Sequence, residues 1–350
     1  MNRVSITVVF AMCCLQEGIA SIHNSDRTYL SSPQTYATMV DGVHGTRRLL
    51  DEHAPIRVFV HYVEDHMNLP AAQDTFLRDT LVPDAKVWLA NAVKVDPVLG
   101  ALKLPRHCTS NWVSPTHGNP CAAFEAAPTC SGIDIPAAFL SEQDVYPTSD
   151  AFLFGTPTVL PGGAGAADAD IIVFVTASTS SSIDNDKCGA SSATAAFAAH
   201  CAQDQLDRPI AGHINFCPEK LDPVADYDSQ LKTALHELMH VFAFSSSLFP
   251  WFRDGATGAA RTARSANGKP PQNACGLYVA DTNTVGTVSL RGTTVHRLVT
   301  PAVVREARAQ FGVADGAARA AAAGGELVNE GSPCGGVVQP GSHFESRVFL

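Results

Sequence analysis

The sequence predicts an α+β fold, in which a mixed β-sheet carries a buried helix and is followed by a partial, loop-rich second subdomain. Short runs of β-branched and aromatic residues before residue 217 are typical of strands. The stretch at residues 231–242 is apolar around most of its circumference, which is typical of a buried helix. After Phe244 the sequence becomes rich in glycine, alanine, asparagine and proline, which favours loops.

The first elements of the fold are a strand and a pair of helices. Ile56–Tyr62 alternates and is rich in β-branched and aromatic residues, so a strand is predicted there. Ala71–Leu81 and Asp84–Val93 have helical sequences. Pro83 lies between them and predicts a break or a bend, because proline has no amide hydrogen to donate.

Two more strands lead to the buried helix. Ile171–Thr176 is a nearly continuous apolar run, which indicates a central strand buried on both faces. Ile210–Phe216 also has the composition of a strand. Ala193–Ala202 is rich in alanine, and its sequence leaves open whether it is helix or strand.

The last hundred residues are less regular. Arg253–Ala274 is predicted to be a surface loop. Thr300–Phe311 is predicted to be a helix, with Thr300 as its N-cap and a proline at its first position. In Gly316–Gly325 the alanines favour a helix and the glycines oppose it. The tail from Glu326 onward is expected to be irregular.

The N-terminus has the features of a secretory signal. Arg3 precedes an apolar run, Val4–Leu15, which is too short to span a bilayer, and small residues precede Ser21. Residues 1–20 are therefore predicted to be a signal peptide. Residues 21–54 are polar and lack periodicity, as expected of a pro-segment or leader.

Charge and cysteine content restrict the class of protein further. The net charge of −10, without a cluster of lysine and arginine, excludes nucleic acid as a partner. Cys13 and Cys14 belong to the predicted signal peptide. An even number of cysteines remains and predicts up to four disulfides of undetermined pairing. These are Cys108, Cys121, Cys130, Cys188, Cys201, Cys217, Cys275 and Cys334.

The buried helix contains the motif His-Glu-x-x-His. His236 and His240 are four residues apart and so share one helical face, from which both imidazoles can reach one zinc ion. Glu237 lies roughly 60° around the helix from His240, so that it can take a proton from a water molecule at the metal. Asp228 or Ser229 is expected to cap the helix.

A catalytic zinc site needs a third protein ligand. No glutamate occurs between Glu237 and Glu306, which weakens a thermolysin-like assignment, and Asp254 lies in a turn-like setting. Ser246 occupies the position six residues after the second histidine, where a short metzincin motif would need a histidine. His296 and His343 remain as downstream histidines, and spacing alone does not choose between them.

Several segments resemble the leishmanolysin/invadolysin family of metzincin zinc peptidases. Besides the helix that carries the His236–His240 motif (the zinc helix), they are Asp207–Pro218, Phe244–Phe249, Phe252–Asp254, Leu298–Pro301 and Gly341–Arg347. The resemblance spans about residues 55–350. It implies a metzincin-like fold and assigns the third zinc ligand to His343, which leaves His296 as a surface or loop histidine. By analogy with other zincins, it also suggests the Ile210–Phe216 strand as the sheet edge on which a peptide pairs.

Two departures from the family pattern concern the surroundings of the zinc site. Ala243 stands where the family has a glycine after the second zinc histidine, so a strained left-handed residue or a slightly longer helix is expected. The resemblance also implies a methionine turn beneath the zinc, but no methionine follows Met239. We therefore expect a truncated or partial product that also lacks the family's C-terminal domain and any lipid-anchor signal.

Together these features predict a secreted zinc endopeptidase that acts on polypeptides with one Zn²⁺ ion. Residues 55–245 are expected to form an N-terminal catalytic subdomain, and residues 246–350 a partial central subdomain that carries the third ligand. The alternative is a catalytically inactive zinc-binding adhesion or binding protein of the same fold. Membrane association of a longer product is left open.

Overall fold

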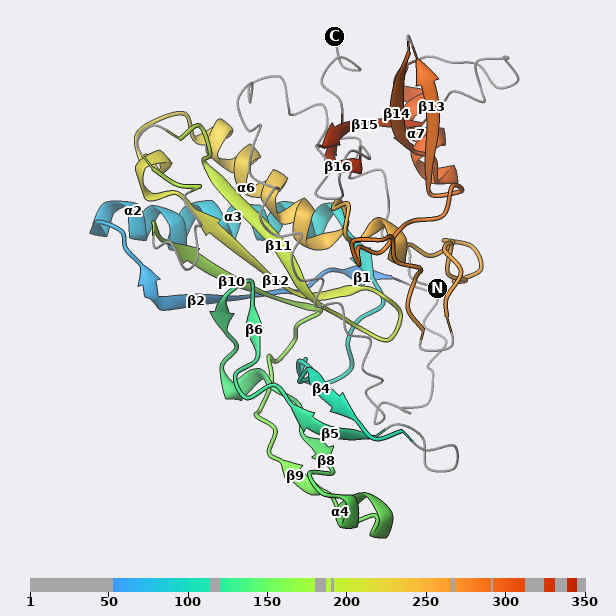
Figure 1. The fold of residues 1–350 in the computed structure, drawn as a ribbon. Helices are drawn as coiled ribbons and strands as arrows, with labels where there is room; N and C mark the ends of the chain where they lie inside the picture. The colour runs from blue at the N-terminus through green and yellow to red at the C-terminus, as the bar shows by residue number, and fades with distance from the viewer. Residues whose placement is uncertain are drawn as a thin grey trace.

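The computed structural model describes residues 53–113, 120–179, 187–189, 192–265, 268–290, 292–311, 324–330 and 339–344. They form a mixed α+β structure, as predicted (Figure 1). The expected signal peptide and nearly all of the expected leader lie outside the described residues. Among the residues that are described, no helix is long and apolar enough to cross a membrane.

A four-stranded mixed sheet forms the centre of the molecule. Its strands run in the order β11–β12–β10–β2, with β10 parallel to both of its neighbours. Their bounds are Val58–Met67 for β2, Ile171–Ala177 for β10, Ala196–Gln203 for β11 and Pro209–Phe216 for β12. Every residue of β10 is buried, which explains why its sequence is apolar throughout and confirms the predicted central strand.

One side of the sheet ends in β11 and not in β12, so the expectation that Ile210–Phe216 is an edge strand is wrong. The alanine-rich segment that the sequence left undecided forms β11 and pairs antiparallel with β12. β12 is thereby enclosed between β11 and β10. The free backbone groups on this side of the sheet belong to Ala196–Gln203.

The helices predicted on either side of Pro83 form one continuous rod. Its parts are α2 (Ala71–Phe76), a π-helical stretch (Leu77–Leu81) and α3 (Val82–Ala92). Pro83 is the second residue of α3, and the irregularity precedes it as a wider turn in which the Val82 amide donates to the Leu77 carbonyl. The interruption therefore lies on the N-terminal side of the proline, which has no amide hydrogen to donate.

The helix α6 (Tyr227–Phe242) packs across β11 and β12 on one face of the central sheet (Figure 1). Its N-cap is Asp226, whose carboxylate accepts from the Ser229 amide, and not Asp228 or Ser229 as expected. Ala243 ends the helix with φ −159°, outside the left-handed region. The predicted strain at Ala243 is therefore absent, and the helix does not extend past Phe242.

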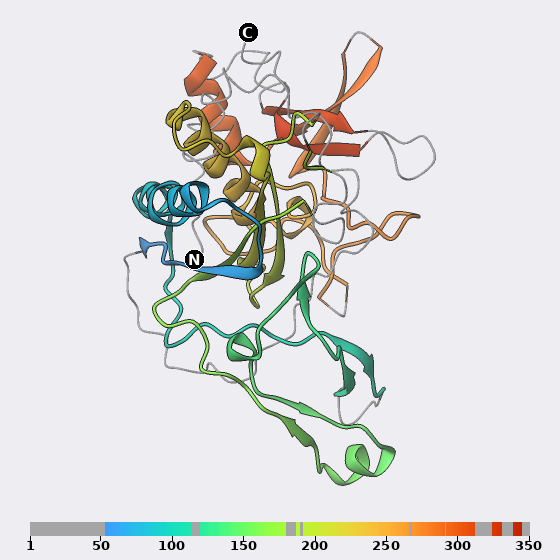
Figure 2. The same cartoon turned by 90° about the vertical axis from the view of Figure 1, so that its left-hand side faces the viewer.

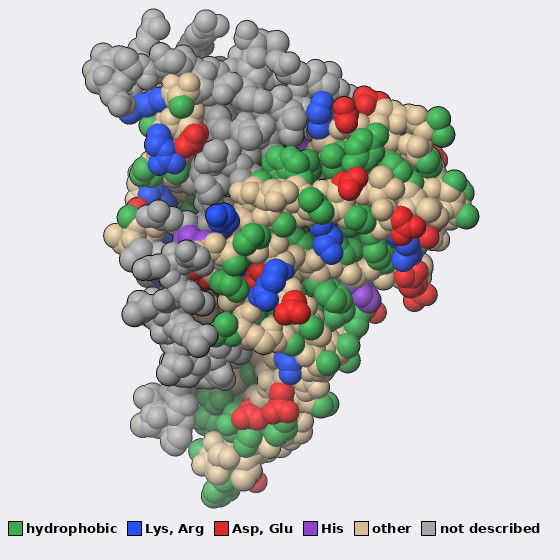
Figure 3. Space-filling view, turned by 180° about the vertical axis from the view of Figure 1, so that it is seen from behind, with side chains coloured by type: hydrophobic (Ala, Val, Ile, Leu, Met, Phe, Trp, Pro, Cys, Tyr) green, Lys and Arg blue, Asp and Glu red, His purple; other side chains and the backbone are tan. Residues whose placement is uncertain are grey.

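A lobe between α3 and β10 projects from the opposite face of the sheet (Figures 1 and 2). It contains the hairpin of β4 (Cys108–Asn111) and β5 (Cys121–Phe124), the pair β6 (Thr129–Cys130) and β7 (Ile133–Asp134), the pair β8 (Gln143–Val145) and β9 (Thr158–Leu160), and α4 (Ser149–Phe154). The chain enters it after β1 (Ala54–Pro55) has paired with β3 (Lys94–Val95). Apolar side chains are exposed at the end formed by α4 (Figure 3).

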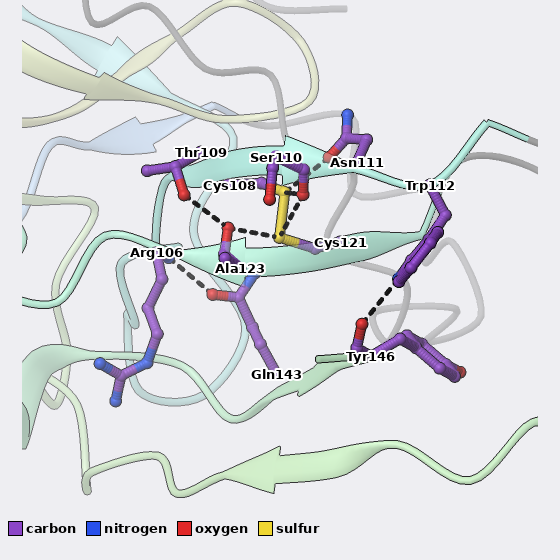
Figure 4. The surroundings of a disulfide bond; sticks show 10 residues. All are labelled: Arg106, Cys108, Thr109, Ser110, Asn111, Trp112, Cys121, Ala123, Gln143 and Tyr146. Carbon is purple, nitrogen blue, oxygen red and sulfur yellow. Dashed lines mark hydrogen bonds between the residues drawn. A yellow bond between two sulfur atoms is a disulfide. The ribbon is translucent and has the colours of Figure 1, made fainter. Parts of the chain in front are cut away.

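Disulfides join parts of this lobe to each other and to the sheet. Cys108–Cys121 closes the β4–β5 hairpin, beside which the Trp112 indole N–H donates to the Tyr146 carbonyl at 2.6 Å (Figure 4). Cys130–Cys201 joins the lobe to β11, and Cys188–Cys217 ties the segment before β11 to the end of β12. Cys275 is also disulfide-bonded, so the expectation of a disulfide framework is confirmed for the described cysteines.

A second sheet follows the irregular segment after α6. It has the order β13 (Val285–Leu290), β14 (Thr293–Leu298), β15 (Gly325–Glu330) and β16 (Gln339–Phe344), all antiparallel. The expectation of an irregular tail from Glu326 is therefore wrong, because two strands lie there. The predicted helix is confirmed as α7 (Pro301–Phe311), where the Thr300 hydroxyl faces the Val303 amide. Most of Gly316–Gly325 lies outside the described residues.

Asp207 joins the central sheet to the segment after α6. It lies in the turn between β11 and β12 with φ +62°, and its carboxylate is buried. The guanidinium groups of Arg253 and Arg264 both donate to its Oδ2, at 2.9 and 3.0 Å. The turn of the edge hairpin and the chain leaving the helix are thereby held together.

Candidate metal centre

His236 and His240 project from the same face of α6, one helical turn apart. Their ring centroids are 4.9 Å apart with the planes nearly perpendicular, and their Nε2 atoms are 3.3 Å apart. This arrangement follows from the i, i+4 spacing on a helix whose other faces are held by the core. Two imidazole nitrogens thus point to one place.

His343 comes to the same place from β16 of the second sheet. Its Nε2 lies 3.2 Å from Nε2 of His236, and the two rings are stacked with centroids 5.2 Å apart. One nitrogen from each of the three histidines lies within 4.8 Å of the others. Within the described part of the chain, this is the single group of three or more histidine, cysteine, aspartate or glutamate residues that could hold a metal.

The spacing of these nitrogens fits a zinc ion. Nitrogens bound to tetrahedral zinc at 2.0–2.1 Å lie about 3.3 Å apart, which matches the 3.3 and 3.2 Å separations measured from His236. Three ligands occupy three corners of a tetrahedron and leave the fourth for water or substrate. Among the described residues, the three histidines are therefore a donor set that could hold a zinc ion and leave one position free.

A backbone carbonyl fixes the orientation of one ring. His240 Nδ1 lies 2.7 Å from the Phe244 oxygen, so Nδ1 carries the hydrogen and Nε2 keeps the lone pair that faces the other rings. The Phe244 amide in turn donates to the Met239 carbonyl, which holds the end of the helix in place. No sequence pattern could have indicated this contact, because its acceptor is a backbone atom.

The ring of His236 is kept in the neutral form that binds metals. Burial lowers its pKa well below the ordinary value, and the neighbouring His240 and His343 lower it further. A neutral imidazole offers a lone pair, whereas a protonated one cannot bind a cation.

Glu237 lies on α6 between the two helical histidines. Its side chain is 3% exposed and engaged with its surroundings. A buried carboxylate is costly unless it interacts with a proton, a donor or a metal. Glu237 follows His236 directly in the sequence, so this buried carboxyl group lies on the same helix as two of the three clustered histidines.

The other candidate ligands lie elsewhere. Asp254 is a solvated turn residue, as expected, and its carboxylate accepts from the amides of Ala256 and Thr257. Glu306 lies on α7 and pairs with Arg305. His296 is neither a surface nor a loop histidine, which corrects the expectation: it is buried on β14 and its Nδ1 lies 2.9 Å from Asn329 Oδ1.

Comparison with known proteins agrees with this arrangement. The family model described as leishmanolysin, peptidase M8, matches residues 154–349, a range that includes all three histidines and Glu237. A leishmanolysin-like peptidase of Caenorhabditis elegans is 32% identical over 86% of this chain and 45% of its own length. The corresponding Drosophila melanogaster peptidase is 31% identical over 76% of this chain and 40% of its own length.

A third relative bears a different name. The ciliated left-right organizer metallopeptidase of Xenopus laevis is 31% identical over 94% of this chain and 42% of its own length. The chain thus spans less than half of the length of these curated relatives. Because the family model covers more than half of this chain and the relatives match most of it, the chain belongs to the leishmanolysin family of metallopeptidases.

Proposed function

We propose that this chain is the catalytic part of a zinc-dependent endopeptidase with a metzincin-like fold. The observation that carries the proposal is the approach of three imidazole nitrogens at the spacing of a zinc tetrahedron, with Glu237 on the same helix as two of them. A purely structural site would have no need of that carboxylate. His236, His240 and His343 would hold the ion through Nε2.

When bound, zinc supplies a Lewis acid that polarises the scissile carbonyl and acidifies water at its open position. Glu237 accepts a proton from the attacking water as the water oxygen bonds to the carbonyl carbon. It then delivers this proton to the amide nitrogen as the carbon–nitrogen bond breaks. The carboxylate returns to its starting state, and the products are a new carboxyl group and an amine.

The substrate would bind as an extended peptide along β11. This strand forms the edge of the central sheet on the side where α6 packs, and its outer backbone groups can pair with another strand. The β11 side chains are mostly small, as in Ala196, Ala198 and Ala199, so they leave room for a chain laid against them. Polypeptides are therefore the substrate class.

The protein is secreted or exposed at the cell surface in this proposal. Disulfides such as Cys130–Cys201 persist in oxidising compartments and are rare in the cytosol. Cys130–Cys201 joins the lobe to the edge strand, so that its reduction would disturb the sheet on which substrate is proposed to bind.

The proposal is tested by zinc content and casein hydrolysis in the wild type and three variants. We expect Glu237→Gln to retain zinc and to lower the rate by about 10²–10⁴-fold, because proton transfer is lost while the ligands remain. His343→Ala should lose both zinc affinity and activity. Asp254→Ala, which removes a rival ligand in the turn after the helix, should keep both.

Each outcome points to one reading. Zinc binding without hydrolysis in the wild type would support the inactive binding protein instead. Unchanged zinc affinity in His343→Ala would refute the assignment of the third ligand, and loss of zinc in Asp254→Ala would move that role to the turn after the helix.

A further inference from the structure

His343, the third histidine of the proposed zinc site, lies where the pairing of β16 with β15 is irregular. β15 and β16 pair at Leu327–Phe344 and again at Asn329–Pro340. Between these pairs, one residue of β15 faces three residues of β16, and His343 is one of those three. The ladder alone therefore does not determine the position of the His343 ring.

The residue before His343 contacts the turn that follows the zinc helix. Ser342 is 2% exposed, and its Oγ accepts from the Ser246 amide at 2.9 Å. The Ser342 hydroxyl also donates to Ser246 Oγ, at 3.3 Å. Two residues separated by 96 positions in the sequence thus share two hydrogen bonds.

The turn that carries Ser246 is itself fixed to the helix. The Phe244 amide donates to the Met239 carbonyl, and the Phe244 carbonyl accepts from the His240 ring. A short path therefore runs from the His240 ring through Phe244 and Ser246 to Ser342 and the His343 ring. These contacts connect the second and third histidines directly, without the long chain segment that separates them in the sequence.

We propose that the Ser246–Ser342 contact positions His343 for metal binding, so that Ser342 is a positioning residue of the zinc site. This inference rests on the proposed zinc function. Partners of this kind orient ligands, and their loss typically weakens metal affinity by about 10–100-fold. In a shorter metzincin motif, the position of Ser246 would carry the third histidine itself. Here the Ser246 amide instead binds β16, the strand that carries His343.

The test compares Ser342→Ala, Ser246→Ala and Ser247→Ala with the wild type. Zinc affinity is measured by competition with a chromogenic chelator, and ligand geometry by the visible spectrum of the Co²⁺-substituted protein. Ser342→Ala removes the acceptor of the Ser246 amide, so we expect zinc affinity to fall by about 10–100-fold and the cobalt bands to shift. Ser246→Ala keeps the 2.9 Å bond and should show a smaller loss in the same direction.

Ser247→Ala is the matched control. Its hydroxyl contacts Ser245 Oγ at 2.8 Å in the same turn and lies outside the path to His343, so zinc affinity and the cobalt spectrum should stay unchanged. If Ser342→Ala fails to fold, Ser246→Ala alone decides. Wild-type affinity and cobalt bands in the folded serine variants would overturn the proposal.

The outcomes separate this inference from the proposed function. If the wild type binds zinc and Glu237→Gln is inactive while Ser342→Ala binds zinc normally, the positioning role is wrong and the peptidase stands. If the wild type binds no zinc at all, both fail. Loss of thermal stability in metal-free Ser342→Ala, without a change in the cobalt spectrum of the folded protein, would indicate a merely structural contact and would also overturn the proposal.

Discussion

Asp170 illustrates how a single buried charge is stabilised in this fold. Its carboxylate is 1% exposed and accepts from the backbone and side chain of Arg57 and from the Val98 amide, at 2.7–3.0 Å. Burial raises its pKa, but the hydrogen bonds from Arg57 and Val98 outweigh burial, so the net pKa lies below its usual value. The ionised form therefore stabilises the folded state at neutral pH.

We predict that Asp170→Asn lowers the free energy of unfolding by about 3 kcal/mol at pH 7, because it leaves Arg57 with a weaker partner. The contribution of Asp170 is fully present above the ordinary carboxyl pKa and is lost as pH falls through the lower pKa of the folded state. Urea unfolding at pH 7 and near pH 3 measures this difference. The difference in the free energy of unfolding between variant and wild type should be smaller at the lower pH.

The control for this prediction is Asp168→Asn. Asp168 also faces Arg57, at 3.7 Å, but its side chain is 94% exposed. Its positive φ of 50° suits asparagine as well as aspartate. The change should cost less than about 0.5 kcal/mol. If Asp170→Asn lowers the free energy of unfolding equally at both pH values, the ionised form of Asp170 is not the source of the stabilisation.

At the scale of single residues, the sequence predicted those site residues that lie together in a short motif. His236, Glu237 and His240 form a motif because five residues of helix bring them together. His343 is 107 residues from His236, so no local spacing could identify it. The residues alone left His296 as an equal candidate, and only the family resemblance favoured His343. The contact of the His240 ring with the Phe244 carbonyl could not be predicted, because any residue at position 244 has the same backbone oxygen.

At the scale of elements, α6 lies close to the sheet because one residue of β12, Gly212, has no side chain. A Cβ atom at Gly212 would come within 2.3 Å of a Val241 methyl carbon and 2.9 Å of the Ala199 carbonyl oxygen. Val241 is fully buried and follows the second helical histidine directly. The distance between helix and sheet is therefore set at a point adjacent to the metal centre.

Gly212→Ala is predicted to lower stability by about 1–3 kcal/mol, because the added methyl group must push the helix or the edge strand outward. Denaturant unfolding measures the loss. Gly255→Ala is the control, since its Cβ would meet no atom within 4 Å, and it should change stability by less than about 0.5 kcal/mol. Equal losses of stability in the two variants would show that the helix and the sheet are not closely packed at Gly212 in solution.

The start of the same helix gives a third prediction. Asp226→Ala should destabilise the protein by about 1 kcal/mol, because the Ser229 amide loses its carboxylate acceptor. Asp226→Asn should retain most of the stability, since an asparagine side chain also caps helices well. Thermal unfolding at pH 7 compares the two. A larger loss in Asp228→Ala than in Asp226→Ala would restore Asp228 as the cap.

Elements whose type depends on distant partners were the ones that sequence could not predict. β11 is rich in alanine, a residue that favours helix, and it becomes a strand through its pairing with β12. β16 contains Pro340 and Gly341, which argue against a strand, yet both are tolerated because β16 lies at the edge of its sheet and is bulged there. By contrast, β10 was predictable because burial on both faces imposes a continuous apolar run.

At the scale of the whole molecule, the candidate metal centre is built from two separate sheets. His236 and His240 belong to the helix packed on the central sheet, and His343 belongs to the outermost strand of the second sheet. The C-terminal sheet and α6 lie side by side in both views of the fold (Figures 1 and 2). A zinc ion bound by all three histidines would therefore act as a cross-link between the two sheets.

Removal of the metal should consequently loosen one sheet more than the other. After treatment with a chelator, we expect faster amide exchange in β15 and β16, whereas β10 and β12, buried at the centre of the first sheet, should keep their protection. The melting temperature should fall, since an ion at a thousand times its dissociation constant contributes about 4 kcal/mol to stability. Hydrogen exchange by mass spectrometry with and without zinc measures both the size and the place of the change. His343→Ala should show no added protection of β15 and β16 with zinc, because the cross-link is already broken. Protection that zinc raises equally in both sheets would mean that the ion stabilises the fold without joining its two parts.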